Sequence, residues 1–148
     1  MIQSGRMYVI ECLGPMAGNR WLNGETANGR VDLAPDTTDA NSGTKWLATL
    51  GSSGWQFRCI GSQDSSQYLN GVTQQNGVFL DGNANDSGTY WTLNSVSTKN
   101  GADFNVVCNG TAGGNTYLNG DTTTDGCDLA ANTQPSGTTW RFYELAIY

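Results

Sequence analysis

The sequence contains no histidine, and this absence removes the most common catalytic groups. Neither a Ser-His-Asp nor a Cys-His nucleophile can form within such a chain. The four cysteines include no Cys-x-x-Cys pair, so a zinc site would lack a ligand set. An aspartate pair could still hydrolyse glycosides, but most of the aspartates lie in turn-forming stretches. We therefore expect a protein that is not an enzyme and that binds no cofactor and no metal.

Long apolar runs and positive charge are also scarce. No apolar run approaches the ~18 residues that would suggest a membrane-spanning helix. Thirteen acidic residues outnumber seven basic ones, which gives a net charge of −6. Such a surface repels phosphate backbones and anionic lipid, so we expect no nucleic-acid partner and no membrane insertion. The first residues lack the apolar core of a signal peptide, so we expect a cytoplasmic protein, with secretion by another route left open.

What the sequence does contain is a threefold internal repeat. Each copy begins with an aromatic residue before Leu-Asn-Gly, continues through an apolar stretch and ends with Ser-Gly-Thr-x-Trp. The copies run from Trp21 to Trp46, from Tyr68 to Trp91 and from Tyr117 to Trp140. A repeat that fills the chain indicates a symmetric fold, in which a binding surface can occur up to three times.

Alternating apolar residues indicate that each repeat is built from short strands. Tyr8, Ile10 and Cys12 share one face of the first strand, and similar alternation recurs near residues 55–59 and 104–108. In the Leu-Asn-Gly strand the leucine should point inward, with the aromatic residue and the asparagine pointing outward. A third strand follows an Asn-Gly or Asp-Gly pair, and a fourth contains the tryptophan. No helical periodicity is present.

Four short strands in each of three repeats predict an all-β fold, a β-trefoil in which six strands close a barrel and six form capping hairpins. A three-bladed propeller has the same repeat count, but propellers usually have more blades. We expect a single domain over residues 1–148, with repeats near 1–50, 51–97 and 98–148. The expected core includes Leu22, Leu69, Leu118, Trp46, Trp91 and Trp140.

Three of the cysteines occupy the same inward position in the first strand of a repeat. They are Cys12, Cys59 and Cys108. Cys127 stands where the other two repeats have valine. Since a free cysteine behaves as a small apolar residue, we predict four buried free thiols. A bridge between Cys108 and Cys127 is the alternative.

The order of these motifs resembles the β-trefoil lectins related to the ricin B chain, over essentially the whole chain. In that family a repeat reads roughly Cys-Leu-Asp, Val-Gln-Leu-Trp and Gln-x-Trp. Here Trp21–Asn23, Val31–Ala34 and Thr44–Trp46 follow in the same order. The family's sugar-binding aspartate corresponds to the asparagine of each repeat, whereas its glutamine is replaced by threonine. The resemblance implies sugar binding, directed to galactose or GalNAc, with rearranged contacts.

The candidate carbohydrate-binding residues are the outward side chains of the second and third strands of each repeat. An aromatic face can stack on the C–H face of a sugar, while amides and carboxylates bind its hydroxyls. The alternative is that the rings only cover the hairpins and that Asn-Gly only makes a turn. The candidates are Trp21, Asn23, Asp32, Tyr68, Asn70, Tyr117, Asn119 and Asp128.

Repeat two differs most from the other two. It has Val72 where they have Glu25 and Asp121, so its site is the one we expect to have changed. The leading hypothesis is a non-enzymatic, multivalent lectin whose partners are glycans or glycoconjugates, with a homodimer left open. The alternative is a β-trefoil protease inhibitor that presents the irregular insertion from Ser95 to Asp103.

Overall fold

The computed structural model describes residues 2–14, 18–61, 67–96, 102–111 and 113–146. Twelve antiparallel strands and three short 3-10 helices account for its regular structure. The strands are β1 (Arg6–Cys12), β2 (Trp21–Glu25), β3 (Arg30–Ala34), β4 (Trp46–Gly51), β5 (Gly54–Cys59), β6 (Tyr68–Val72), β7 (Gly77–Asp81), β8 (Trp91–Ser95), β9 (Asp103–Cys108), β10 (Tyr117–Asp121), β11 (Gly126–Ala130) and β12 (Trp140–Glu144). The 3-10 helices are η1 (Asp39–Thr44), η2 (Ser87–Thr89) and η3 (Ser136–Thr138).

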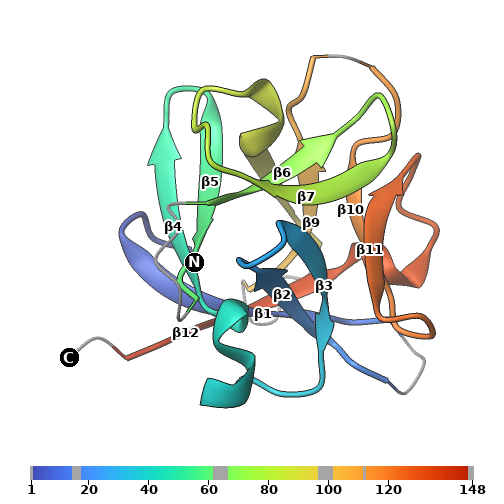
Figure 1. The fold of residues 1–148 in the computed structure, drawn as a ribbon. Coiled ribbons are helices and arrows are strands. Elements are labelled where there is room, and N and C mark those ends of the chain that lie inside the picture. Colours follow the sequence, from blue (N-terminus) through green and yellow to red (C-terminus); the bar gives the residue numbers. More distant parts are fainter. Residues whose placement is uncertain (1, 15–17, 62–66, 97–101, 112, 147–148) are drawn as a thin grey trace.

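All twelve strands belong to one continuous sheet, which closes into a barrel (Figure 1). Ten of them form a ring in the order β11-β3-β2-β1-β12-β9-β8-β5-β6-β7, because β7 pairs again with β11. Outside this ring, β4 pairs with β1 and β5, and β10 pairs with β9 and β11. The closed arrangement satisfies strand edges that short strands would otherwise leave open.

The predicted β-trefoil of three four-stranded repeats is wrong as a description of this sheet. Long pairings join strands of different repeats, as β4 does with β5 and β1 does with β12. Within the first repeat, β1 meets β2 only where Glu11 faces Trp21. The barrel therefore closes through pairings between repeats and not through four strands within each repeat. The structure is an all-β closed antiparallel barrel.

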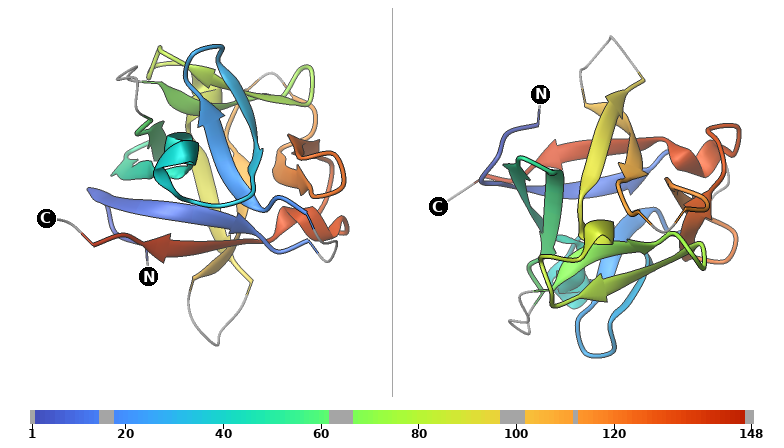
Figure 2. Two further views of the ribbon diagram at one scale, coloured as in Figure 1. Left: turned by 60° about the horizontal axis from the view of Figure 1, so that its bottom comes forward. Right: turned by 90° about the horizontal axis from the view of Figure 1, so that it is seen from above.

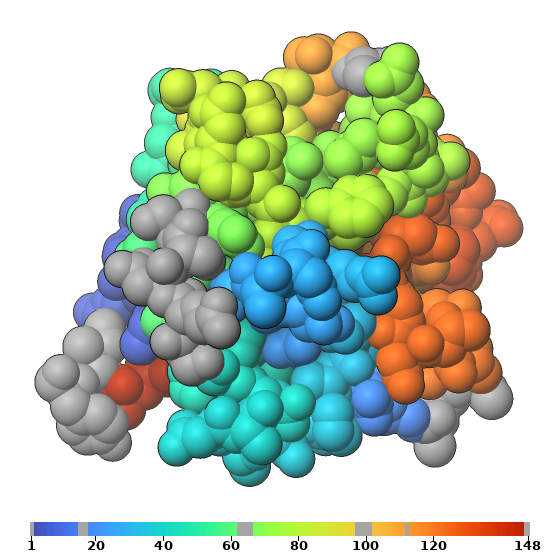
Figure 3. All heavy atoms as spheres, in the orientation of Figure 1, coloured from blue at the N-terminus to red at the C-terminus, as the bar shows by residue number. Residues whose placement is uncertain are grey.

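Threefold repetition nevertheless persists within the barrel. The hairpins β2–β3, β6–β7 and β10–β11 gather on one face, where β3, β7 and β11 each pair with the other two. Figure 2 shows the same barrel from two further sides, with β1 and β12 running together along it. In the space-filling view of Figure 3, the three hairpins meet around a common centre. Equivalent sites on the three repeats therefore face different directions around this centre.

The predicted core residues are confirmed. The three leucines and the three tryptophans are fully or almost fully buried: Leu22, Leu69, Leu118, Trp46, Trp91 and Trp140. Each indole N–H donates to the carbonyl of the leucine in its own repeat. These bonds are Trp46 Nε1 to Leu22 O at 3.0 Å, Trp91 Nε1 to Leu69 O at 2.9 Å, and Trp140 Nε1 to Leu118 O at 2.9 Å. The core tryptophan thus fixes the strand that carries the candidate asparagine.

Among the described residues, the expectation of no helix is wrong at the Ser-Gly-Thr segments. Each segment forms or ends a 3-10 helix immediately before the core tryptophan. Every threonine hydroxyl bonds to the carbonyl three residues earlier, a local contact that favours a tight turn over a strand. The bonds are Thr44 to Asn41 O, Thr89 to Asp86 O and Thr138 to Pro135 O.

The prediction of four free cysteines is confirmed, whereas the prediction that all four are buried is wrong. All four cysteines are free, and Cys12, Cys59 and Cys108 are buried. Cys127, on β11, is only partly buried, whereas Val31 and Val78 at the equivalent positions of β3 and β7 are buried. Residues 97–101 of the insertion proposed as an inhibitory loop lie outside the described residues. Within the described residues, no helix has the length and apolar character needed to cross a bilayer.

Candidate carbohydrate-binding sites

Three pockets occupy equivalent positions in the three repeats. In each, the Asn-Gly of the hairpin and a nearby threonine form one wall, and the Ser-Gly of the 3-10 helix forms the other. Site 1 contains Asn23, Gly24, Thr26, Ser42 and Gly43; site 2 contains Asn70, Gly71, Thr73, Ser87 and Gly88; site 3 contains Asn119, Gly120, Thr122, Ser136 and Gly137. Their volumes are about 430, 240 and 230 Å³ respectively. The repeat therefore produces three recesses of the same build.

The floor of each site depends on glycine because the backbones approach closely. A Cβ at Gly88 would lie 2.2 Å from the Gly71 carbonyl oxygen and 2.5 Å from Asn70 Oδ1. A Cβ at Gly71 would lie 2.6 Å from the Sγ of Cys108, which lies beneath. The Cys108 thiol bonds to the carbonyls of both glycines at 3.6 Å. Cys59 does the same under site 1 and Cys12 under site 3.

This floor explains why the cysteines and glycines recur together. Each thiol comes from the first strand of the following repeat, so neighbouring repeats build one site jointly. Burial raises the pKa of the Cys59 thiol to about 11, and burial also raises the pKa values of Cys12 and Cys108. Thiols held in their protonated form act as hydrogen-bond donors to the floor and not as nucleophiles.

The predicted asparagines lie at the pocket wall. In sites 1 and 3 the amide donates across the hairpin to the facing aspartate. Asn23 Nδ2 lies 2.8 Å from Asp32 Oδ1, and Asn119 Nδ2 lies 2.8 Å from Asp128 Oδ1. Since each bond fixes the orientation of the amide, it presents a rigid polar pair at the surface. In site 2, Asn70 faces Phe79 and has no such acid.

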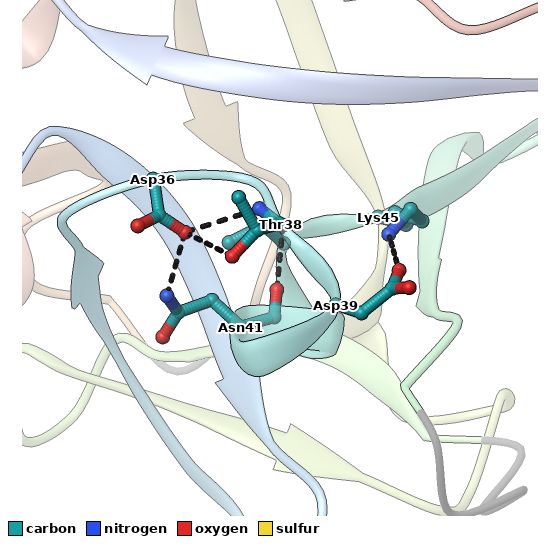
Figure 4. Close-up of polar contacts among 6 residues, drawn as sticks. Asp36, Thr38, Asp39, Asn41 and Lys45 are labelled. Carbon is teal, nitrogen blue, oxygen red and sulfur yellow. Dashed lines mark hydrogen bonds and ion pairs between the residues drawn. The ribbon is translucent and has the colours of Figure 1, made fainter.

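The rim of site 1 is organised by an aspartate that sequence reasoning did not single out. Asp36 accepts hydrogen bonds from the Thr38 backbone and hydroxyl and from Asn41 Nδ2, as Figure 4 shows. These bonds lower the pKa of Asp36. The Asn41 backbone also donates to the Thr38 carbonyl at 2.8 Å. The network holds Asn41 at the wall of site 1, and Asp39 pairs with Lys45 nearby at 3.9 Å.

Site 1 also contains a pair of interacting acids. Burial raises the pKa of Asp32 to about 7, and the hydrogen bond and charge of Glu25 add to this rise. The hydrogen bond from Asp32 in turn lowers the pKa of Glu25. The two carboxyls thus share a proton that resides on Asp32 near neutral pH. Both residues line the site, so its charge changes near neutral pH.

Site 3 keeps the asparagine and aspartate but changes the neighbouring acid. Asp121, which replaces Glu25, accepts hydrogen bonds from the backbone and hydroxyl of Thr123. The hydroxyl contact is the largest cause of its lowered pKa. Asp121 is therefore bound to its own turn and not to Asp128. Pro135 occupies the rim where site 1 has Asn41.

Site 2 has the most altered rim. Val72 replaces the acid, and the acid present is Asp86, which accepts from Asn83 Nδ2 at 3.2 Å. A hydrogen bond with Asp81 raises the pKa of Asp86. Phe79 is 44% exposed, and its ring lies over Gly77. The predicted change in repeat two is thus visible as the loss of the facing aspartate.

The three aromatic residues that were predicted to contact the sugar do not line the three recesses. Trp21, Tyr68 and Tyr117 are half-buried, but none of them is among the described lining residues of the three sites. The Trp21 ring packs against Tyr143 at 5.7 Å, and the Tyr143 hydroxyl donates to Glu11 Oε1 at 2.8 Å. Contact between these rings and a sugar stays a prediction. The serines and threonines of the sites were missed, although the repeated Ser-Gly-Thr could have indicated them.

The described residues were also compared with the requirements of a metal site. Among them, no group of three or more cysteine and acidic residues is arranged to hold a metal ion. The polar groups of the three sites are amides, hydroxyls and carboxylates, which suit hydrogen bonding to a neutral hydroxylated ligand.

No family profile matches the sequence, and no curated protein matches it in sequence. Solved structures do match its fold. A GlcNAcα1-4Gal-releasing endo-β-galactosidase from Clostridium perfringens has a TM-score of 0.74 and 14% identity, covering 95% of this chain and 33% of that one. SeviL bound to asialo-GM1 saccharide has a TM-score of 0.69 and 10% identity, covering 97% of this chain and 100% of that one.

A lectin from Polyporus squamosus bound to a sialylated epitope has a TM-score of 0.71 and 16% identity, covering 98% of this chain and 51% of that one. The chain thus spans about a third of the galactosidase and about half of this lectin. At these identities the matches show the fold alone. The structures that share this fold thus include one bound to a saccharide and one named as a lectin.

Proposed function

We propose that this chain is a non-enzymatic lectin that binds neutral glycans in sites 1, 2 and 3. The observation that carries the proposal is the same recess built three times, with an asparagine held over a glycine floor beside a Ser-Gly turn. The glycines let the hairpin and the 3-10 helix approach each other closely, and this contact forms the floor of the recess. The polar walls then supply fixed hydrogen-bond groups, as carbohydrate sites require.

The chemistry of sites 1 and 3 suits a sugar with adjacent hydroxyls. In site 3 the lining residue Asp121 places an exposed carboxylate beside Asn119, and a carboxylate can accept from a sugar hydroxyl. The Asn119 Nδ2 and the Ser136 hydroxyl offer further hydrogen-bond groups, whereas the Asn119 Oδ1 is buried. Carboxylates at the sites and a net charge of −6 disfavour anionic sugars, so neutral glycans are the better fit.

The structural neighbours support the carbohydrate reading. One was solved with asialo-GM1 saccharide and another is a lectin with a bound oligosaccharide. The proposed specificity for galactose or GalNAc rests on the resemblance of the repeat motifs to the ricin B-chain-like lectins. Three sites pointing in different directions would let one molecule engage several glycans on a surface, and avidity can then exceed single-site affinity by ~10²–10⁴.

A glycan array tests the proposal directly. Wild-type protein should bind arrays of galactose- or GalNAc-terminated glycans more strongly than their sialylated forms. The triple variant Asn23→Ala/Asn70→Ala/Asn119→Ala serves as the control, because its side chains lie at the sites and not in the core. If wild-type protein binds no glycan at any printed density, the lectin proposal is rejected.

A further inference from the structure

A fourth recess, absent from the predictions, lies beside site 2. We call it the Tyr90 pocket, and it is lined by Ser53, Asn85, Ser87, Tyr90, Asn109 and Thr111. Its volume is about 260 Å³, close to the 240 Å³ of site 2. Ser87 and Thr111 line both recesses, so the two share a wall.

The shared wall consists of two small polar side chains. Ser87 Oγ lies 3.4 Å from Thr111 Oγ1, and the Thr111 backbone donates to the same serine oxygen at 3.4 Å. Both residues are exposed, so their hydroxyls can face a ligand on either side. A molecule seated in site 2 can therefore extend over these two small side chains into the Tyr90 pocket.

The far wall of the Tyr90 pocket is held in place by Asn109. Its Nδ2 donates to the Ser53 carbonyl at 3.1 Å, and its Oδ1 accepts from Thr92 Oγ1 at 2.9 Å. Its backbone donates to the Tyr90 carbonyl at 2.8 Å. Gly54, at φ +128°, permits this approach, since a Cβ there would lie 2.8 Å from Asn109 Nδ2. The wall beside the tyrosine is thus preorganised.

The described residues of the other two repeats lack this combination of side chains. The backbone bond between Asn109 and Tyr90 recurs in repeat one and in repeat three, so the positions are equivalent. The recurring pairs are Ile60 with Lys45 and Leu13 with Thr139. Neither pair combines an aromatic ring with an amide. The Tyr90 pocket is therefore a property of repeat two, the repeat whose own site lacks the facing aspartate.

We infer that the Tyr90 pocket binds the second sugar residue of an oligosaccharide whose first residue occupies site 2. This rests on the proposed function. The tyrosine ring offers an apolar face for a sugar ring, and the amide and hydroxyls around it offer hydrogen bonds. None of the six lining residues carries a charge, which matches a neutral sugar. Repeat two thus selects glycans by length, where the other repeats bind single terminal residues.

The test isolates site 2 and compares short with long ligands. The variant Asn23→Ala/Asn119→Ala leaves site 2 as the intact site, and calorimetry measures its affinity for galactose and for lactose. If an array shows another preferred monosaccharide, that sugar and a disaccharide ending in it are the probes. Adding Tyr90→Ala should lower disaccharide affinity about tenfold, or ~1.4 kcal/mol, with monosaccharide affinity unchanged.

Two controls separate binding from folding. Tyr90→Phe keeps the ring and should retain most of the preference for the disaccharide. Thr139→Ala changes the equivalent position of repeat three and should have no effect. The melting temperature should stay within a few degrees in all variants.

Four other outcomes would overturn the inference, each for a different reason. If Tyr90→Ala leaves the ratio of disaccharide to monosaccharide affinity unchanged, the pocket binds no second residue. If both affinities fall equally, Tyr90 acts only through site 2. If the Asn23→Ala/Asn119→Ala variant binds no sugar while wild-type protein does, site 2 is no site, and the lectin proposal survives. Absence of binding by wild-type protein rejects both proposals.

Discussion

Sites 1 and 3 differ from site 2 at the rim, whereas the floors of all three are the same. Each floor has two glycines, a thiol from the next repeat and a core tryptophan bonded to the hairpin leucine. At the rim, Asn23 and Asn119 each bond to an aspartate, while Asn70 faces Phe79. The comparison separates the residues that packing requires from those that are free to vary.

The floor residues are alike in the three sites because a larger side chain at the glycines would clash with neighbouring atoms. Added atoms at the glycines collide with backbone oxygen or sulfur, so no larger residue fits without a shift of the chain. The rim residues are exposed or half-buried, so substitutions there cost little stability. Repeat two could therefore lose its aspartate and gain the Tyr90 pocket without loss of the barrel.

The largest effect should come from removing the two asparagines that have aspartate partners. Single-site sugar binding in the millimolar range amounts to about −4 kcal/mol, and engaging several sites raises avidity by ~10²–10⁴. Asn23→Ala and Asn119→Ala should each weaken agglutination of glycan-coated beads, and the double variant should nearly abolish it. Asn70→Ala should weaken it less.

All three single variants should remain folded, which circular dichroism can check, because the side chains lie outside the core. Should Asn70→Ala alone abolish agglutination while the other two variants agglutinate normally, the ranking of the sites is wrong.

Removal of a core tryptophan should have the next largest effect. Trp91→Ala removes a fully buried ring and its 2.9 Å bond to the Leu69 carbonyl. The free energy of unfolding should fall by about 3 to 5 kcal/mol, measured by denaturant titration. The control is Leu50→Ala, since Leu50 is 54% exposed. A loss below ~1 kcal/mol for Trp91→Ala would mean that the ring does not support the fold as described.

A smaller loss should follow from adding one methyl group to the floor of site 2. Gly88→Ala places a Cβ against the Gly71 carbonyl and should cost about 1 to 3 kcal/mol of unfolding free energy. Gly82→Ala is the matched control, because a Cβ there meets nothing within 4 Å. Equal stabilities of the two variants would contradict the close approach of helix η2 to the hairpin.

The smallest expected effect is a pH dependence of stability that arises from site 1 and not from site 3. The pKa of Asp32 is raised to about 7 when folded, while an unfolded aspartate titrates near ~3.9. The folded state thus holds a proton that the unfolded state has lost, so this group lowers stability as pH rises from about 4 through about 7. Asp32→Asn should gain melting temperature over wild type at pH 8 but not below about pH 4.

Asp128→Asn is the matched control, because Asp121 bonds to Thr123 and leaves Asp128 without an interacting acid of that kind. A gain at pH 8 in Asp128→Asn and not in Asp32→Asn would reverse the assignment of the acid pair.

Much of this architecture could be predicted from the periodicity of the sequence. The repeat located the hairpins, the buried leucines and tryptophans and the free cysteines, because these follow from local alternation. The closure of the sheet could not be read this way, since pairings such as β4–β5 and β1–β12 depend on how repeats meet. The Ser-Gly-Thr helices were missed because they span only three to six residues, too few for a helical periodicity to show in the sequence.

The site was predictable only in part. The asparagines at the recesses could be predicted to face outward because they alternate with buried leucines, and Asp32 and Asp128 follow the same alternation on the facing strand, although only Asp32 lines its recess. Alternation alone could not show that Trp21 would pack against Tyr143, because that ring comes from the far end of the chain. The Tyr90 pocket combines side chains from three separate segments, so nothing in the local pattern indicated it.

The central claim is that the asparagine of each recess meets the glycan, and the side-chain amides report this directly. Nuclear magnetic resonance can follow the side-chain amide signals of Asn23, Asn70 and Asn119, assigned through the three Asn→Ala variants, as a galactose-terminated glycan is added. The account predicts saturable shifts of the Asn23 and Asn119 amide signals, with the Asn70 signal responding more to a disaccharide than to galactose. Saturable shifts confined to the Trp21 indole, with all three amide signals unmoved, would contradict it.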